Sequence, residues 1–362
     1  MDDRRTVQDG MLRSVSIRNF RVFHELSIEH LSRINLIAGR NNAGKTSLLE
    51  ALFLLAGGAD PQMALNSNVV RLSNLPVSGP RNTLRETYWK PMFTGLDMDK
   101  IVEITGAHFA QGPLTLRISL EQQTVAELPI QHSGEVSAGN ISIEPALLFS
   151  FQIGFTAEVE GRVQIEGQSL RIDKPNVTIP FVATILSTQA MNHPEDADRL
   201  SRLRKQKKDA RLLSALRIIE PRLQSIEVNS ASGVPMIWGD IGLSELVPLA
   251  MMGDGMTRLA RLVLAIATTP NGIVLVDEIE TGLHHKVLSD IWRAVDEAAR
   301  EFDTQIVATT HSYECLRAAH QSLGEGGGFL LHRLEISDSG NRCITYWPED
   351  IGAAIRHDLE VR

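Results

Sequence analysis

The segment at residues 39–46, with the sequence GRNNAGKT, has the residue types and spacing that hold the phosphates of a nucleotide. Gly39 and Gly44 permit a tight turn in which backbone N–H groups approach phosphate oxygens closely. Lys45 is expected to reach the β- and γ-phosphates, and Thr46 to offer its hydroxyl to Mg²⁺. We therefore predict a nucleotide site here. Its members are Gly39, Arg40, Asn41, Asn42, Ala43, Gly44, Lys45, Thr46 and Ser47.

The residues on both sides of this loop support the prediction. Residues 34–38 are mostly apolar, as a buried strand requires, and residues 47–53 have helical character. In a strand, loop and helix arrangement, the N–H groups of the helix N-terminus point at the phosphates. The alternative is a chance match in an ordinary glycine-rich loop.

A pair of carboxylates follows a second apolar run and is expected to complete the site. Residues 273–276 predict a buried strand, and Asp277 and Glu278 stand at its end. A carboxylate there can hold Mg²⁺, and its neighbour can polarise a water against the γ-phosphate. We predict that Asp277 joins Thr46 at the metal and that Glu278 is the general base. The alternative is a polar pair that caps an ordinary strand.

A third strand, predicted at residues 304–309, leads to His311 after two threonines. A histidine at this strand end would sense or orient the γ-phosphate. A lone structural histidine is the alternative. The predicted catalytic residues are Glu278, His311 and Lys45.

Composition excludes several classes of protein. The 362 residues carry a net charge of −8, which argues against a uniformly basic nucleic-acid binder but not against a local basic groove. Cys315 and Cys343 form neither a disulfide framework nor a metal-ligand spacing. No apolar run reaches the ~18 residues of a membrane span, and the polar N-terminus lacks a signal-peptide core. We expect a cytoplasmic protein.

The pattern of apolar residues predicts an α/β protein with inserts. From residue 101 to about 181, period-2 segments predict an antiparallel lobe, and residues 59–100 predict an irregular insert with a helix-like piece at 84–93. Further helices are predicted at 195–221, 255–268 and 283–301, and a further strand at 329–334.

One segment is strongly basic. Seven of the thirteen residues from Arg199 to Arg211 are Lys or Arg. They would suit a non-specific, salt-sensitive contact with the backbone of DNA or RNA. The alternatives are a solvated helix face and a surface for an acidic partner protein.

The order of these motifs resembles the ATP-binding-cassette type of ATPase, and within it the heads of RecF, SMC and OLD nucleases. The resemblance rests on the glycine loop, a long insert, Gly253-Asp254-Gly255 before a helix, DEIETGLH at 277–284 and TTHS at 309–312. It covers about residues 11–335 and is greatest with stand-alone OLD-like AAA/ABC ATPases of prokaryotic defence or toxin–antitoxin loci. It implies a P-loop NTPase core sheet, an antiparallel β lobe and a helical insert, with ATP and Mg²⁺ as cofactors.

The resemblance also implies roles in a dimer. In that family two heads sandwich two ATP molecules, and a signature loop of one head closes on the γ-phosphate held by the other. Here the matching loop is Gly253, Asp254 and Gly255, which departs from the usual Ser-Gly-Gly; a plain helix start is the alternative. Residues 280–282 would cross to the partner. Gln189 would link Mg²⁺ to the lobes, and Arg21 would contact base or phosphate.

These expectations lead to two functions. The first is an ATPase switch, a homodimer or higher homo-oligomer, that controls a separate effector in anti-phage defence. The alternative is a RecF-like ATPase that binds DNA during repair. The OLD nucleases, which this chain resembles, cut nucleic acid with a Glu and an Asp-x-Asp pair. The two such patterns here, Asp97/Asp99 and Asp196/Asp198, are predicted to lie in polar loops rather than after strands, so we expect no nuclease chemistry. The predicted domains are 11–58 and 241–335 (two parts of the core), 59–190 (insert and β lobe), 191–240 (helical lobe) and 336–362 (tail).

Overall fold

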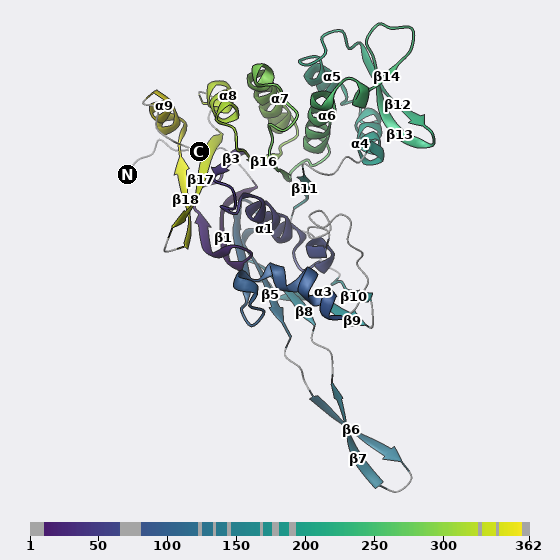
Figure 1. Ribbon diagram of the computed structural model, residues 1–362, viewed down its shortest axis with the longest axis vertical. Helices are drawn as coiled ribbons and strands as arrows, with labels where there is room; N and C mark the ends of the chain where they lie inside the picture. Colours follow the sequence, from purple (N-terminus) through teal and green to yellow (C-terminus); the bar gives the residue numbers. More distant parts are fainter. Residues whose placement is uncertain are drawn as a thin grey trace.

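The computed structural model describes residues 11–65, 81–121, 125–132, 135–142, 146–166, 169–175, 181–187, 193–324, 328–337 and 340–356. They are arranged in layers (Figure 1). A mainly parallel sheet is covered on one face by helices, and helix α1 (Lys45–Gly57) separates its other face from a large antiparallel sheet. This is the predicted α/β class. In the described part of the chain, no helix is both long and apolar enough to cross a membrane.

The parallel sheet carries the predicted site. Its strand order is β11-β15-β16-β3-β17-β18, in which only β18 runs antiparallel to its neighbour. The bounds are β3 Ile34–Gly39, β11 Ala183–Leu186, β15 Ile273–Val276, β16 Gln305–Thr309, β17 Phe329–Ser337 and β18 Gly340–Tyr346. Since parallel strands end at the same edge, β3, β15 and β16 bring their following loops together.

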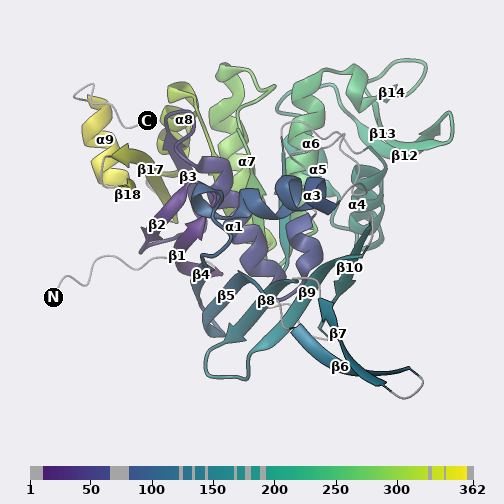
Figure 2. The ribbon, with the colours of Figure 1, turned by 60° about the horizontal axis from the view of Figure 1, so that its bottom comes forward.

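The antiparallel sheet has the order β10-β9-β8-β5-β4-β1-β2. Its strands are β1 Leu12–Phe20, β2 Phe23–Ile28, β4 Val102–His108, β5 Gly112–Leu120, β8 Leu147–Ile153, β9 Val159–Glu166 and β10 Ser169–Asp173. The predicted boundaries differ here in two ways. Strands β1 and β2 belong to this sheet rather than to the core, and β11, expected in the lobe, pairs with β15 in the core. A separate hairpin, β6 (Val125–His132) and β7 (Glu135–Ser142), extends from the sheet (Figure 2).

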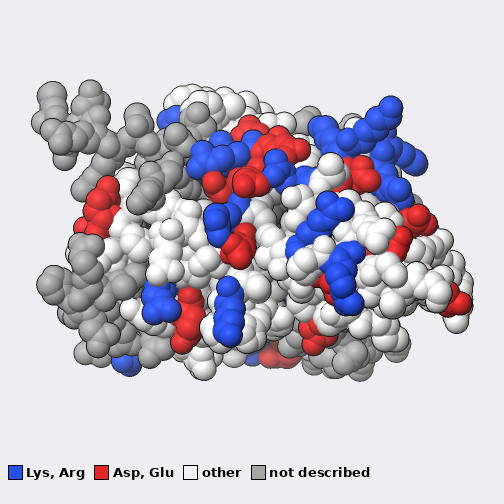
Figure 3. All heavy atoms as spheres, turned by 90° about the horizontal axis from the view of Figure 1, so that it is seen from above, with Lys and Arg blue, Asp and Glu red and all other residues white. Residues whose placement is uncertain are grey.

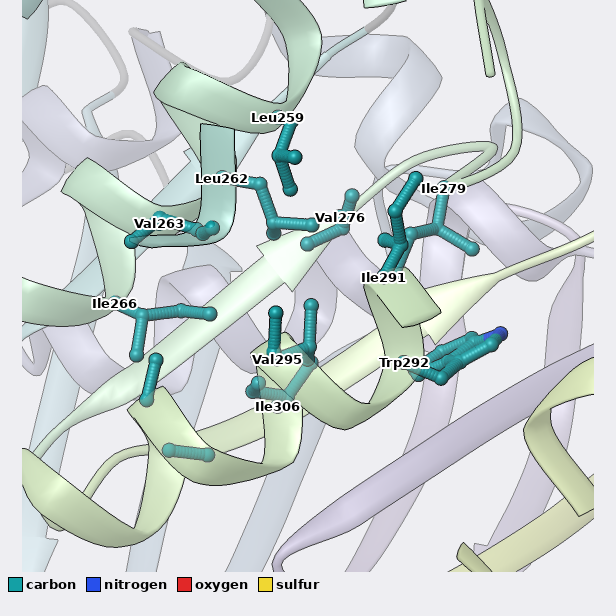
Figure 4. Packing of buried hydrophobic residues seen from close by; sticks show 14 of the residues in the cluster. Leu259, Leu262, Val263, Ile266, Val276, Ile279, Ile291, Trp292, Val295 and Ile306 are labelled. Atoms are coloured by element: carbon teal, nitrogen blue, oxygen red, sulfur yellow. The ribbon is translucent and has the colours of Figure 1, made fainter. Parts of the chain in front are cut away.

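Alternation along the buried strands divides the core into two parts. Val274 and Val276 of β15 pack with the covering helices, whereas Ile273 and Leu275 pack with α1. A strand with both faces covered must be apolar at every position, which explains the continuous run in the sequence. The covering helices are α6 Asp254–Ala267, α7 Leu288–Glu301, α8 Tyr313–Leu323 and α9 Pro348–Arg356. Figure 4 shows α6 and α7 side chains meeting over β15 and β16.

The region expected to be a helical lobe, residues 191–240, is only partly helical. It begins with α4 (His193–Lys205) and α5 (Ala210–Leu216), which replace the single predicted helix. Residues 225–240 then form strands β12 (Ser225–Ala231) and β13 (Val234–Asp240), which pair with β14 (Val247–Pro248). The turn at Ser232 and Gly233, both with positive φ, reverses the chain between them. The assignment to a helical lobe is therefore wrong for residues 225–240, because it did not account for this turn.

The predicted helix-like piece near residues 84–93 is confirmed as a series of short turns. It contains α3 (Arg81–Leu84), a π-helical turn (Arg85–Trp89) and two 3₁₀ turns (Lys90–Met92 and Thr94–Leu96). Tyr88 and Trp89 are buried in the core between α1 and the antiparallel sheet. These two aromatic side chains therefore pack the irregular insert against the core.

Candidate functional site

The glycine loop takes the backbone shape that its sequence predicts. Gly39 and Gly44 have φ of 143° and 96°, and Gly44 is the residue before the first turn of α1. A Cβ on Gly39 would lie 2.5 Å from the carbonyl oxygen of Leu334, and one on Gly44 would lie 2.5 Å from the ring of Phe23. Both positions therefore require glycine for conformation and for space.

Lys45 is the first residue of α1 and is buried. Its Nζ donates to the carbonyl oxygens of Gly39 (2.7 Å) and Arg40 (3.0 Å), so the ammonium lies inside the curve of the loop. Burial lowers the pKa of Lys45, while the charges of Asp277, Glu278 and Glu280 act to raise it. The ammonium is therefore close to the carboxylates that follow β15.

The two halves of the predicted site meet at Thr46 and Asp277. Thr46 Oγ1 donates to Asp277 Oδ2 at 3.1 Å. On the other side, Thr309 Oγ1 donates to Asp277 Oδ1 at 2.7 Å. The Thr46 hydroxyl, from the helix after β3, and the Thr309 hydroxyl, from the last residue of β16, thus orient the same carboxylate. Asp277 faces the start of α1, as the prediction requires.

Glu278 lines the site and has an unusual backbone conformation. Its φ is 46°, in the left-handed region that costs energy for a residue with a side chain. The Glu278 N–H donates to Thr309 Oγ1 at 2.8 Å, which holds this conformation. Its carboxylate Oε1 lies 3.5 Å from His311 Nε2, and both side chains are about 40% exposed. The strained backbone turns Glu278 away from the core and toward His311.

These residues border a pocket of about 450 Å³ above the glycine loop. The lining residues are Val22, Asn41, Asn42, Gly44, Lys45, Thr46, Ser47, Glu278 and His311. Its size and mixed polar lining suit a phosphorylated small molecule. Arg40 and Ala43 instead line a neighbouring hollow of about 310 Å³, together with residues 333–336.

The donor set fits a hard divalent cation. A hydroxyl and a carboxylate oxygen are ligands that Mg²⁺ accepts in combination with phosphate oxygens. Thr46, which lines the pocket, and Asp277 supply them and already lie within hydrogen-bonding distance of each other. Gln189, the third predicted metal residue, lies outside the described residues.

Arg258 is a buried residue of the site that the sequence did not reveal. It stands on α6, and its guanidinium donates to the carbonyl oxygens of Ser187 (3.2 Å), Asp277 (2.6 Å) and Glu278 (3.2 Å). Burial, followed by the charge of Arg261, lowers the pKa of Arg258. The helix that begins at the Gly253–Gly255 loop is therefore fastened to the backbone of both predicted carboxylate residues. The spacing of Arg258 along α6 gave no signal of this contact.

The Gly253–Gly255 loop does not line the pocket of its own chain. Gly253 and Asp254 are exposed at the start of α6. Gly255 faces the loop after β15, since a Cβ there would lie 3.1 Å from the carbonyl oxygen of Gly282.

Arg21 precedes a residue of the pocket but is not itself one of the lining residues. Its Nε pairs with Glu50 Oε2 at 3.1 Å, and its Nη1 donates to the carbonyl oxygen of Pro91 at 3.2 Å. The next residue, Val22, lines the pocket. The turn between β1 and β2 thus borders the site, while the Arg21 guanidinium ties that turn to α1.

The basic segment is largely neutralised by local acids. Each of its four arginines contacts a carboxylate: Arg199 with Glu195, Arg202 with Asp198, Arg204 with Asp209, and Arg211 with Glu297 and Glu301. Lys205, Lys207 and Lys208 form the exposed turn between α4 and α5. Figure 3 shows acidic and basic side chains alternating across the middle of one face, with Lys and Arg gathered at its upper right edge.

Comparison with known proteins identifies one relative along most of the chain and others along short segments of it. An ATP/GTP phosphatase of Helicobacter pylori is 25% identical over 348 residues, which cover 87% of this chain and 89% of that protein. The DNA double-strand break repair Rad50 ATPase of Archaeoglobus fulgidus is 41% identical over 64 residues, 18% of this chain and 7% of that protein. The DNA replication and repair protein RecF of Clostridioides difficile is 31% identical over 70 residues, 19% of each chain.

The fold and the family follow from two further similarities. A solved SMC head bound to the C-winged helix domain of ScpA has a TM-score of 0.51 at 14% identity, with 94% of this chain and 99% of that chain covered. The chain thus has the fold of a P-loop ATPase head. A family model described as "AAA domain, putative AbiEii toxin, Type IV TA system" matches residues 166–317, and one described as "AAA domain" matches residues 14–227. Because the latter spans more than half of the sequence, the chain belongs to the AAA domain family.

Proposed function

We propose that this protein is an ATPase that works as a molecular switch, in which ATP binding brings two heads together and hydrolysis releases them. The observation that carries the proposal is the contact of Asp277 with Thr46, which lines the same pocket as Glu278 and His311. Phosphate binding, metal binding and proton transfer each have a suitable group there.

In the proposed reaction, Lys45 exchanges its two carbonyl acceptors for oxygens of the β- and γ-phosphates. Glu278 accepts a proton from the water that attacks the γ-phosphorus, and His311 orients the γ-phosphate. Mg²⁺, when bound, would neutralise charge on the phosphates, and Thr46 and Asp277 are the residues that would hold it. Release of ADP and phosphate returns Lys45 to the loop carbonyls.

Dimerisation through the nucleotide is part of the proposal. Gly253 and Asp254 are exposed and lie outside the pocket of their own chain, so the N–H groups at the start of α6 are available to an anion held by a second copy. A homodimer, or a higher oligomer built from it, would then have two complete sites.

The output is proposed to belong to a separate effector protein in anti-phage defence, in the cytoplasm. The toxin–antitoxin description of the family model at residues 166–317 supports this setting. The chain itself would hydrolyse ATP and leave DNA and RNA uncut.

Purified chain, with and without the proteins encoded beside its gene, tests the proposal. ATP hydrolysis is expected from the chain alone, and the effector's output only from the complex with an intact Lys45. Metal-dependent cutting of nucleic acid by the chain alone, lost on mutation of acidic residues outside the pocket, would overturn the division of labour.

A RecF-like DNA-binding ATPase is the second candidate, and the exposed lysine turn is the observation that favours it. If duplex DNA binds there, replacing Lys205, Lys207 and Lys208 with alanine should abolish DNA-stimulated hydrolysis and reduce the salt dependence of binding. As a control, replacing Lys90, Lys100 and Lys174 with alanine removes the same charge from other parts of the surface. This variant should keep the DNA-stimulated hydrolysis and the salt dependence of DNA binding. Hydrolysis that duplex DNA never stimulates would exclude this candidate.

A further inference from the structure

Glu280 connects the loops that follow two neighbouring core strands. It stands three residues after Asp277, beyond β15. Its Oε1 accepts hydrogen bonds from the main-chain N–H groups of His311 (2.8 Å) and Ser312 (3.1 Å), beyond β16. Both donors immediately precede α8, at the end of a helix where an anion is favoured. The carboxylate therefore holds the backbone on which the His311 side chain is mounted.

The position of this contact matters for the geometry of Glu278 and His311. Glu278 Oε1 lies 3.5 Å from His311 Nε2. Ile279 N–H donates to the carbonyl oxygen of Thr309 at 3.0 Å, which joins the same two loops closer to the strands. His311 lies two residues beyond that link, so without Glu280 no further hydrogen bond in the described part of the chain ties its backbone to the loop of Glu278.

The two oxygens of the Glu280 carboxylate have different surroundings. Its second oxygen, Oε2, is buried and has no hydrogen-bond partner among the described residues. A buried unpartnered oxygen of a charged group costs free energy. The charge also acts on Lys45 and Arg258, which face the site from α1 and α6. The carboxylate is therefore held by one oxygen on the His311 backbone, beside the proposed reacting groups.

We propose that Glu280 is a positioning residue for ATP hydrolysis: its carboxylate fixes the His311 backbone so that the imidazole lies against Glu278. The inference rests on the proposed roles of Glu278 and His311. The resemblance implied only that residues 280–282 would reach the second head of a dimer. The inference gives Glu280 a role inside its own head. In the described part of the chain Glu280 hydrogen-bonds to the backbone of His311 and Ser312 and not to Lys45, so its loss should lower turnover far more than ATP affinity.

Steady-state kinetics and calorimetry on the full chain test this role. Glu280→Ala should lower kcat about tenfold or more while the Kd for ATP changes less than about twofold. Glu280→Gln keeps an acceptor oxygen on a side chain of the same length, so its kcat should fall less than that of Glu280→Ala. In a double-mutant cycle, Glu280→Ala added to His311→Ala should cause no further loss, because Glu280 acts through His311. If the fall in kcat of the double variant equals the product of the two single falls, the inference is overturned.

Amide hydrogen exchange decides the contact independently of turnover. Peptides that cover residues 309–316 should exchange faster in Glu280→Ala than in the wild type. Peptides from the other parts of the site should exchange at the wild-type rate. Glu314→Gln is the matched control, since it removes a charge from the same end of α8 and keeps an oxygen that can accept from the Ser312 hydroxyl, so it should change neither exchange nor kcat. Unchanged exchange in folded Glu280→Ala overturns the contact. A wild-type chain without ATPase activity would instead overturn the proposed function.

Discussion

Thr46 and Asp277 are 231 positions apart in the sequence, yet Thr46 Oγ1 donates a hydrogen bond to Asp277 Oδ2 at 3.1 Å. Asp277 also accepts from Thr309, so three strand ends converge on one carboxylate. The parallel pairing of β3 with β16 and of β16 with β15 produces this convergence. The glycine loop and the carboxylates after β15 are therefore parts of one site, and variants in either should affect the same proposed reaction.

Lys45→Ala should remove ATP binding without unfolding the protein. The side chain bonds only to loop carbonyls in this structure, whereas with ATP it would face two phosphates. Loss of charge-assisted bonds worth ~3 kcal/mol lowers affinity about 100-fold. Calorimetry measures this, and Lys90→Ala, a surface lysine paired with Glu86, is the control. Unchanged affinity in folded Lys45→Ala would refute the assignment of the loop.

Glu278→Gln should bind ATP and Mg²⁺ normally and hydrolyse ATP slowly. Removing a general base costs about 10²–10⁴-fold in rate. If closure precedes hydrolysis, the variant should also accumulate an ATP-dependent dimer, detectable by light scattering. Glu227→Gln, on β12, serves as a control of equal chemistry. Normal turnover in Glu278→Gln would remove this residue from catalysis.

The start of α6 should act on the nucleotide of a second copy. Gly255 is a poor test because a side chain there would strike Gly282 in its own chain. Asp254 is exposed, so Asp254→Trp should leave ATP binding by one head intact while ATP-dependent association and turnover fall. The same change at Asp290, in the first turn of α7, is the control. Mixing Asp254→Trp with Lys45→Ala should restore at most one working site per dimer, and full activity of Asp254→Trp alone would contradict the prediction.

Asp196 should make the protein less stable as the pH rises from 5 to 7. Burial raises the pKa of Asp196 to about 6, against the charges of Arg261 and Arg199, which lower it. The folded state then binds a proton that the unfolded state has released, so this stabilisation is lost as pH rises through 6. The contribution between pH 5 and 7 is about 1 kcal/mol.

Denaturation at both pH values should show this difference in the wild type and a smaller one in Asp196→Asn. Asp198→Asn, at an exposed position of α4 paired with Arg202, is the matched control and should keep the wild-type difference. An equal pH dependence in Asp196→Asn and the wild type would show that Asp196 ionises normally in the folded protein.

The sequence by itself determined the local parts of the site. Glycine at 39 and 44, the helix after them and the apolar run before Asp277 depend on backbone conformation and on burial, both of which are encoded within a few residues. The order of these parts also predicted the α/β class. The same local reasoning failed at residues 225–240, where a two-residue turn makes strands of a segment assigned to a helical lobe.

Tertiary structure alone decided which distant groups meet. Sheet pairing put Thr309 between Asp277 and the Glu278 N–H, packing of α6 brought Arg258 to the carbonyl oxygens of the same two residues, and adjacent strand ends brought Glu280 to His311. Arg21, expected at the nucleotide, pairs with Glu50 of α1 in this structure, a contact that its place in the sequence does not reveal. Such contacts join residues separated by long stretches of chain, and the spacing along the sequence carries no record of them.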